Sequence, residues 1–104
     1  MKTTKESILH HLRAMKPELE KLGIAELGLF GSFASNRQTV YSDIDIAIRK
    51  RPDFARSGSA YAYFDLLSQI KSRLRRKLHR NIDLFDLDSH SPFLKHIEKE
   101  LIYV

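Results

Sequence analysis

The chain has 104 residues, no cysteine and a formal charge of +5, from 18 Lys and Arg against 13 Asp and Glu residues. This length is enough for one domain with a modest core, so we predict a single domain over residues 1–104. The absence of cysteine excludes disulfides, thiolate metal sites and cysteine nucleophiles.

The N-terminal part of the chain predicts helix and then strand. Apolar residues recur at helical spacing over residues 8–15, and Pro17 is predicted to end this helix and to start a short second one, "PELEKLG", closed by Gly23. "IAELGLF" then predicts a strand over Ile24–Phe30. Ser32 is predicted to cap a short helix over "SFAS".

The middle of the chain predicts a strand with two different faces. In "SDIDIAI", Ser42–Ile48, alternation places three isoleucines on one face and Asp43, Asp45 and Ala47 on the other. The stretch 49–60, rich in Pro, Gly and Ser, is predicted to be a loop within the domain.

The C-terminal part predicts helix, strand and helix. An amphipathic helix is expected over Tyr61–His79 and a strand over Asn81–Leu87. Ser91 is predicted to cap a last helix with Pro92 at its first position. The residues of that helix expected to face inward are Phe93, Leu94, Ile97 and Leu101. The order of elements predicts an α/β (α+β) fold, with helices against a small mixed sheet of about three strands.

Composition limits the partners and the location of the protein. The basic balance favours anionic partners, namely nucleotides, nucleic acid or an acidic protein surface. No apolar run is as long as a membrane span and the polar start is no secretory signal, so we expect a cytoplasmic protein that does not enter a membrane.

Two aspartates interrupt the apolar middle strand. Residues two apart on a strand point the same way, roughly 6.5 Å apart, so Asp43 and Asp45 should converge on one side of the sheet. Their charges would repel by roughly a few kcal/mol, which a bound cation would offset. Oxygen donors without His or Cys nearby favour Mg²⁺.

A third carboxylate and a Gly-Ser turn extend this site. Asp83 lies in the next apolar strand and reaches the same place if the two strands are neighbours. Three carboxylates and a phosphate-bearing substrate fit a two-metal site. Gly31 and Ser32, at a strand-to-helix turn, offer backbone N–H groups and a hydroxyl to a phosphate. Each feature alone has an ordinary surface or turn explanation, but together they predict nucleotide chemistry.

These segments resemble the minimal nucleotidyltransferase (MNT) family of the DNA polymerase beta superfamily. The family pattern is Gly-Ser, ten residues, Asp-x-Asp and a third Asp on a later strand, met here by Gly31, Ser32, Asp43, Asp45 and Asp83. The similarity extends over "LGLFGSFA", "YSDIDIAI", "NIDLFDL" and the closing "HIEKELIYV", which is nearly the whole chain. It implies a polymerase-beta-like nucleotidyltransferase fold.

The resemblance also implies an activity. Such proteins transfer a nucleoside monophosphate, typically AMP from ATP, to a hydroxyl and release pyrophosphate with Mg²⁺. By this resemblance Asp43 and Asp45 would bind two metal ions, and Asp83 would bind the one that activates the acceptor and help to deprotonate it. Gly31 and Ser32 would hold the triphosphate. A chain of this size would then be an antitoxin, a protein adenylyltransferase that modifies a tyrosine of a partner HEPN-domain toxin.

The chain departs from the family pattern at one place. The family often has Arg-Gly where this sequence has Ser35 and Asn36. Asparagine tolerates the left-handed backbone, so the loop is expected to keep its shape, and Arg37 is the candidate to replace the missing arginine. A partner protein, or a second copy in a homo-oligomer, is expected to complete so small a site.

Two alternatives stay open. In the first, the fold has weak or lost activity and neutralises its partner by binding alone. In the second, which is less favoured, the chain is a basic nucleic-acid-binding module. The segment Lys71–Arg80 holds six of the 18 Lys and Arg residues and is read as a solvated helix face or as a dock for an acidic partner or RNA. No aromatic residues interleave with these charges, which argues against a platform for single strands.

Overall fold

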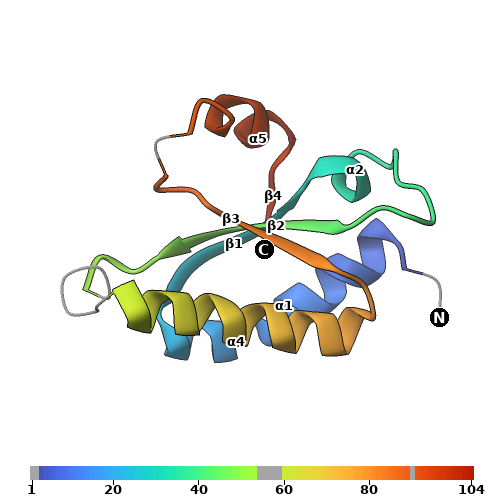
Figure 1. The fold of residues 1–104 in the computed structure, drawn as a ribbon. Helices are drawn as coiled ribbons and strands as arrows, with labels where there is room; N and C mark the ends of the chain where they lie inside the picture. The colour runs from blue at the N-terminus through green and yellow to red at the C-terminus, as the bar shows by residue number, and fades with distance from the viewer. Residues whose placement is uncertain (1–2, 54–59, 90) are drawn as a thin grey trace.

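A computed structural model describes residues 3–53, 60–89 and 91–104 of the chain, in which helices and strands alternate (Figure 1). The elements in chain order are α1 (Lys5–Leu22), β1 (Ile24–Phe30), α2 (Gly31–Ala34), β2 (Ile44–Lys50), α4 (Ala60–Leu78), β3 (Ile82–Asp86), α5 (Leu94–Glu100) and β4 (Ile102–Tyr103). The predicted α+β class is confirmed, and the three predicted strands and the long helix α4 agree with the sequence to within about two residues.

The four strands form one mixed sheet in the order β3-β2-β1-β4. β1 pairs antiparallel with β2 and with β4, whereas β2 and β3 are parallel and are joined through α4. The sheet therefore has one strand more than the three expected. This strand, β4, is two residues long and pairs only with Gly28 and Leu29, too short a segment to show a strand periodicity in the sequence.

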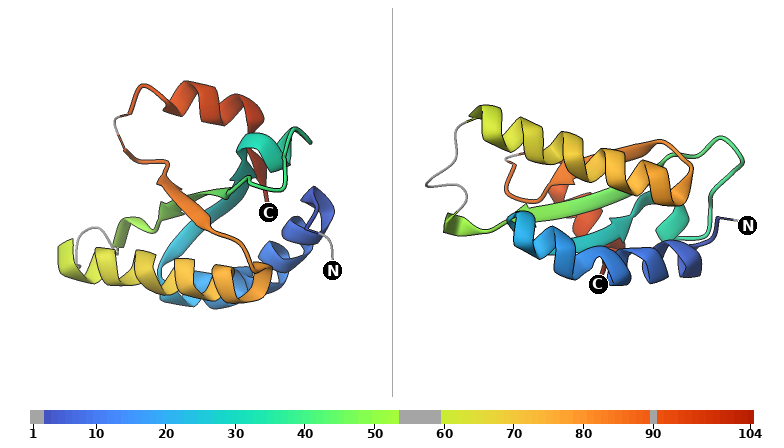
Figure 2. Two further views of the ribbon diagram at one scale, coloured as in Figure 1. Left: turned by 45° about the vertical axis from the view of Figure 1, so that its right-hand side comes forward. Right: turned by 90° about the horizontal axis from the view of Figure 1, so that it is seen from below.

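The helices cover the two faces of the sheet unequally. α1 and α4 lie together on one face, while α2 and α5 lie on the other (Figures 1 and 2). The main core lies under α1 and α4 and contains Ile44, Ile46 and Ile48 of β2, which confirms the predicted alternation. On the opposite face Ala47 packs with Ile97 of α5 in a smaller cluster. Asp45 of β2 shares this second face with Ala47.

The prediction that Pro17 ends the first helix and starts a second one is wrong. The structure has a single helix from Lys5 to Leu22 with Pro17 inside it, and Gly23 ends it with a φ of 118°. A proline inside a helix removes one backbone hydrogen bond and costs roughly 3 kcal/mol. The apolar stripe of α1 continues past the proline and is buried along its length, which outweighs that cost. The buried residues are Ile8, Leu9, Leu12, Met15 and Leu19.

Two predicted helix caps are also wrong. α2 begins at Gly31, so Ser32 lies inside the helix and caps nothing, and Phe30 at the N-cap makes no side-chain cap bond. α5 begins at Leu94, after a turn in which the Phe93 N–H donates to Ser91 Oγ at 3.2 Å. Phe93 was expected to face inward but is 61% exposed, because the helix starts after it.

The predicted loop over residues 49–60 is shorter in the structure. β2 extends to Lys50 and α4 begins at Ala60, while residues 54–59 lie outside the described residues. Within the described residues, none of the helices has the length and apolarity needed to cross a bilayer.

Candidate active site

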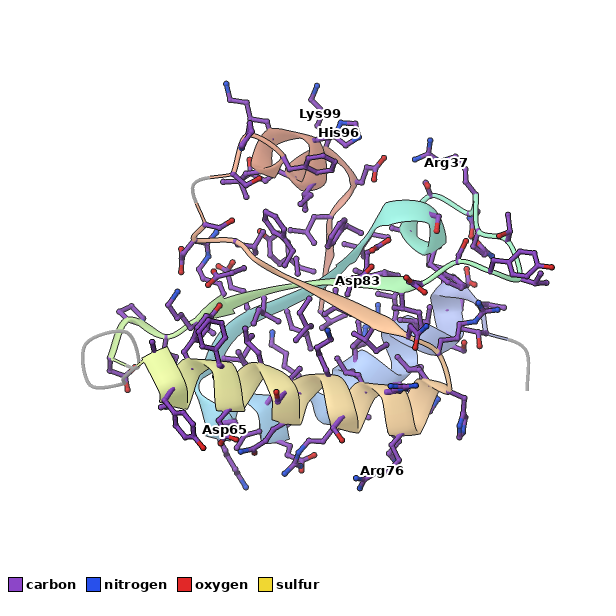
Figure 3. The ribbon with its side chains drawn as sticks, viewed as in Figure 1. Arg37, Asp65, Arg76, Asp83, His96 and Lys99 are labelled. Carbon is purple, nitrogen blue, oxygen red and sulfur yellow. The ribbon has the colours of Figure 1, made fainter. Side chains whose placement is uncertain are left out.

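The register of two parallel strands brings two of the predicted carboxylates together. Asp45 of β2 is the direct partner of Asp83 of β3, and partners in a parallel ladder point to the same side of the sheet. On the other side of β2, Asp45 is paired with Phe30, the last residue of β1. Figure 3 shows Asp83 on β3, which is an edge strand. The predicted neighbourhood of the two aspartate-bearing strands is thus confirmed.

Asp43 comes from the segment just before β2 rather than from the strand itself. Strand pairing begins one residue later, where the Ile44 N–H donates to the Asn81 carbonyl at 3.0 Å. Asp43 is exposed and lines the same surface groove as Asp83. The two aspartates of the Asp-x-Asp motif therefore differ in exposure, because Asp45 is partly buried and Asp43 is exposed to solvent.

Gly31 lets the Asp45 carboxylate approach the backbone at the start of α2. Its φ is +78°, a left-handed conformation that favours glycine. A Cβ added at Gly31 would lie 2.1 Å from Oδ2 of Asp45. The glycine of the Gly-Ser turn is needed both for its backbone angle and for the space that the carboxylate occupies.

The carboxylates interact electrostatically. Burial first, and then the charges of Asp83, Asp43 and Glu100 in that order, together raise the pKa of Asp45 to about 6. Four carboxylates therefore share one electrostatic environment. Glu100, at the end of α5, is a member that sequence reasoning missed, because its approach depends on how α5 folds back over the sheet and has no local signal.

The chemical type of the available ligand atoms suits a magnesium site. Asp43, Asp45 and Asp83 offer only carboxylate oxygens, the ligands that Mg²⁺ prefers, and the repulsion felt by Asp45 is what a bound cation would relieve. Within residues 3–53, 60–89 and 91–104, no three His, Asp or Glu side chains are placed so as to enclose a metal ion by themselves.

The loop after α2 keeps its shape despite the departure from the family pattern. Asn36 has a φ of 59°, so the predicted tolerance of asparagine for the left-handed backbone is confirmed. Ser35 Oγ donates to the Gly31 carbonyl at 3.1 Å and accepts from Arg37 Nε at 2.8 Å. Arg37 also donates to Glu100 Oε1 at 2.9 Å. Glu100, whose charge contributes to the raised pKa of Asp45, therefore also holds Arg37 near the site.

Arg80 fixes the segment that carries Asp43. Its Nη1 donates to the Ser42 carbonyl at 2.8 Å and to the Val40 carbonyl at 3.2 Å. Its guanidinium also lies over the ring of Phe33, 5.3 Å from the ring centroid. The sequence placed Arg80 on a solvated helix face, but the helix ends at Leu78 and this arginine turns back to the loop before β2.

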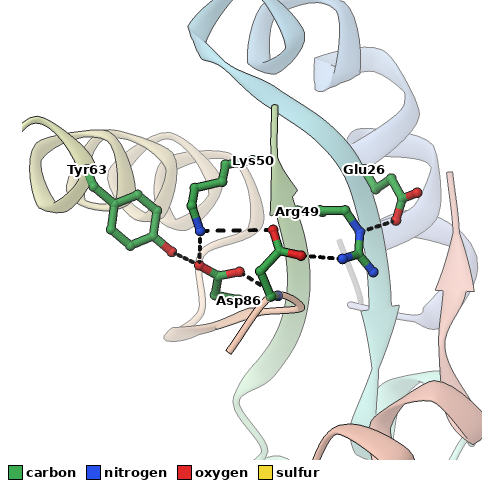
Figure 4. Close-up of polar contacts among 6 residues, drawn as sticks. Glu26, Arg49, Lys50, Tyr63 and Asp86 are labelled. Atoms are coloured by element: carbon green, nitrogen blue, oxygen red, sulfur yellow. Dashed lines mark hydrogen bonds and ion pairs between the residues drawn. The ribbon is translucent and has the colours of Figure 1, made fainter. Parts of the chain in front are cut away.

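The opposite end of the sheet holds a separate network of ion pairs (Figure 4). Lys50 Nζ lies 3.0 Å from Asp86 Oδ2, and the Tyr63 hydroxyl donates to the same carboxylate oxygen. Arg49 pairs with Glu26 at 3.0 Å and with Asp88. These charged groups pair with one another at the C-terminal ends of β2 and β3. We therefore assign them a structural role at the joint between α4 and the sheet, where Tyr63 of α4 meets Asp86.

Comparisons with known proteins identify the family of the chain. A family model described as "Polymerase beta, Nucleotidyltransferase" matches residues 14–104. The chain is 38% identical over 107 residues to a protein of Methanocaldococcus jannaschii named "Putative protein adenylyltransferase MJ0126", and the match covers 100% of both.

Two solved structures have the same fold. One is a toxin–antitoxin structure with AMP-PNP, which has a TM-score of 0.59, 26% identity, and coverage of 97% of this chain and 72% of that chain. The other is a tri-AMPylated Shewanella oneidensis HEPN toxin in complex with an MNT antitoxin, with a TM-score of 0.50, 23% identity, and coverage of 88% and 69%. The family match over most of the chain and the full-length similarity to the Methanocaldococcus protein show that the chain belongs to the polymerase beta nucleotidyltransferase family.

Proposed function

We propose that this nucleotidyltransferase moves AMP from ATP to a tyrosine hydroxyl of a HEPN-domain toxin and so acts as an antitoxin. The observation that carries the proposal is the register that sets Asp45 opposite Asp83, beside the backbone of Gly31. The name of the Methanocaldococcus relative and the AMPylated toxin in the Shewanella complex support AMP as the transferred group. The AMP-PNP in the other complex supports ATP as its source.

Each residue of the site has a role in this transfer. Asp43, Asp45 and Asp83 would hold Mg²⁺, which neutralises charge on the phosphates and favours loss of the acceptor proton. The backbone N–H groups at Gly31 and Ser32, where α2 begins, would hold the triphosphate.

The proposed reaction exchanges one phosphorus–oxygen bond for another. The acceptor oxygen bonds to the α-phosphorus, the bond from that phosphorus to the oxygen bridging the β-phosphate breaks, and pyrophosphate leaves. Asp83 is the group that takes the hydroxyl proton, because it is exposed at the sheet edge and open to an incoming partner.

Label transfer tests the proposal. The chain is incubated with Mg²⁺, a purified HEPN toxin and ATP labelled at the α-phosphate, and in a parallel reaction with ATP labelled at the γ-phosphate. Nucleotidyl transfer predicts label on the toxin from the α-position only. The double variant Asp43→Asn/Asp45→Asn should lose the label, whereas Asp65→Asn, which changes an exposed carboxylate on α4, should keep it. Label that survives the double variant would overturn the assignment.

One observation favours the second candidate, neutralisation by binding alone. Arg37 is the candidate for the position that the family often fills with arginine, and its Nη2 pairs with Glu100 Oε1 at 2.9 Å, so a phosphate would have to compete with a carboxylate for this guanidinium. A variant Asp43→Asn/Asp45→Asn that still protects cells from the toxin, with no label on it, would establish this candidate in place of transfer.

A further inference from the structure

An open groove of about 680 Å³ lies along the free edge of β3, beside the proposed catalytic carboxylates. One wall is the outer side of α4 and the other is the start of β3 with the segment before β2. The lining residues are Asp43, Ser68, Lys71, Ser72, Arg75, Arg76, Asn81, Ile82 and Asp83. The groove is therefore acidic where the chemistry is proposed and basic along the helix.

The basic residues of this groove are not used by the fold. Lys71 and Arg75, one helical turn apart, are exposed, as is Arg76, which points away from the sheet in Figure 3. In the part of the chain that the structure describes, no carboxylate pairs with any of the three. Arg73 of the same helix does have such a partner, Glu18 of α1. The unpaired charges mark a surface that can receive an anionic partner.

A second groove continues this surface past Asp43. It holds about 490 Å³ and shares Asp43, Arg75 and Asn81 with the first. Its outer rim carries two apolar side chains in solvent, Val40 at 77% and Tyr41 at 91% exposure. An exposed tyrosine next to arginine is a composition typical of protein–protein contact sites.

We propose that the first groove docks an acidic polypeptide segment of the acceptor protein and so brings its hydroxyl to Asp43 and Asp83. The inference rests on the proposed function and adds the chemistry by which the partner is recognised. Spaced Asp or Glu side chains would meet Lys71 and Arg75 while a neutral hydroxyl enters between the two aspartates. A continuous phosphate backbone fits less well, because Asp43 and Asp83 would repel it. Among the described residues, none that lines the first groove is aromatic and able to stack a base.

Binding of a model anion tests the docking without any need for transfer. The probe is a fluorescein-labelled random copolymer of Glu and Tyr, followed by fluorescence anisotropy in the absence of nucleotide. Lys71→Glu/Arg75→Glu should weaken binding by about tenfold or more, and added salt should weaken wild-type binding, as expected for an electrostatic contact. Lys71→Gln/Arg75→Gln should give a smaller loss in the same direction, and circular dichroism checks that each variant is folded.

A charge-matched control separates the groove from the net charge. Arg13→Glu/Lys77→Glu changes the total charge equally at exposed residues of α1 and α4 that line neither groove. It should change the affinity by no more than about twofold. Equal weakening by both pairs, or no binding of the copolymer by the wild type, would overturn the proposal. So would a uridine homopolymer that binds more tightly than the copolymer and depends on Lys71 and Arg75.

The docking and the transfer can fail separately. If the copolymer binds through Lys71 and Arg75 but no AMP reaches a toxin, the docking surface stands and the proposed activity is wrong. If AMP is transferred and the charge reversals leave copolymer binding unchanged, the activity stands and the docking surface is wrong.

Discussion

At the scale of single residues, the main feature of the site is Asp45, a carboxylate whose ionised form is unfavourable in the folded chain. The partial burial of Asp45, and then the charges of Asp83, Asp43 and Glu100, raise its pKa to about 6. Such a residue lowers the stability of the folded chain when it is ionised. Its position is understood if a cation is bound there during function, so the residue that costs stability is the one that the proposed activity needs.

The pKa of Asp45 predicts how stability depends on pH. Because the folded-state pKa is raised from 3.8 to about 6, the folded chain binds more protons than the unfolded chain between these values. In metal-free buffer the free energy of unfolding should therefore rise, relative to that of Asp45→Asn, as the pH falls from 7.5 to 5. This shift corresponds to at most about 1.4 kcal/mol over that pH range, and we expect a difference of about 1 kcal/mol or less because the carboxylate is partly solvated. Urea denaturation of both proteins measures it, and parallel pH profiles would contradict it.

Gly31 predicts a coupled effect with Asp45. Gly31→Ala should lower the free energy of unfolding by about 2–4 kcal/mol, because alanine is strained at positive φ and its Cβ would meet the carboxylate. In an Asp45→Ala background the clash disappears and only the backbone cost remains, so the same substitution should cost about 1–2 kcal/mol. Equal losses in the two backgrounds, measured by urea denaturation, would show that the close approach is absent.

Residues at the site differ in how far the sequence could reveal them. Asp43, Asp45 and Asp83 could be predicted because each is a charge in or beside an apolar strand. Glu100 and Arg80 could not, since one belongs to a helix end that folds back over the sheet and the other to a turn after a helix. Their contacts depend on tertiary packing between segments far apart in the sequence.

At the scale of elements, α1 shows how packing overrides local preference. Pro17 is exposed on a helix whose other face is buried, so its replacement by alanine should restore the missing backbone hydrogen bond without disturbing the core. Pro17→Ala should raise the free energy of unfolding by roughly 1–2 kcal/mol, after allowance for the greater freedom of the unfolded chain. Thermal and urea denaturation measure this gain. Glu20→Ala, at another exposed position of α1, should change stability by less than about 0.5 kcal/mol.

The joint between α4 and the sheet provides a test at the other end of the molecule. Burial raises the pKa of the Tyr63 hydroxyl, which donates to Asp86 in the network that includes Lys50. Tyr63→Phe should lower the free energy of unfolding by about 1–2 kcal/mol, the usual contribution of a hydrogen bond to a charged group. AMP transfer should remain unchanged, because this network lies at the ends of β2 and β3 remote from Asp45. A strong loss of transfer with intact stability would place Tyr63 in the catalytic machinery.

The elements with a repeated apolar period could be predicted, whereas β4 and the exact starts of the short helices α2 and α5 could not. The alternation of isoleucines in β2 and the apolar stripe of α4 are repeated often enough to set the type of each element. β4 has two residues and forms only because the chain returns to β1 after α5, where the Val104 N–H donates to the Leu27 carbonyl at 3.0 Å. The exact starts of α2 and α5 depended on packing rather than on their predicted serine caps.

At the scale of the whole molecule, the sheet separates the parts of the fold that serve stability from those proposed to serve chemistry. The main core lies between the sheet and the pair α1 and α4. Asp45 lies on the other face with Ala47, which is the face that α2 and α5 cover (Figure 2), and the groove lined by Asp43 and Asp83 lies at the edge of β3. This arrangement leaves room for a partner at the edge of β3, in keeping with a chain too small to bind an acceptor by itself.

The measurement that tests the central claim most directly is the intact mass of a HEPN toxin after co-expression with this chain. Wild type and Asp65→Asn should each add one or more AMP groups to the toxin, and the additions should map to a tyrosine. Asp43→Asn/Asp45→Asn and Asp83→Asn should leave the toxin at its unmodified mass while remaining folded. AMP additions that persist in these variants, or an unmodified toxin beside the wild type, would contradict the account.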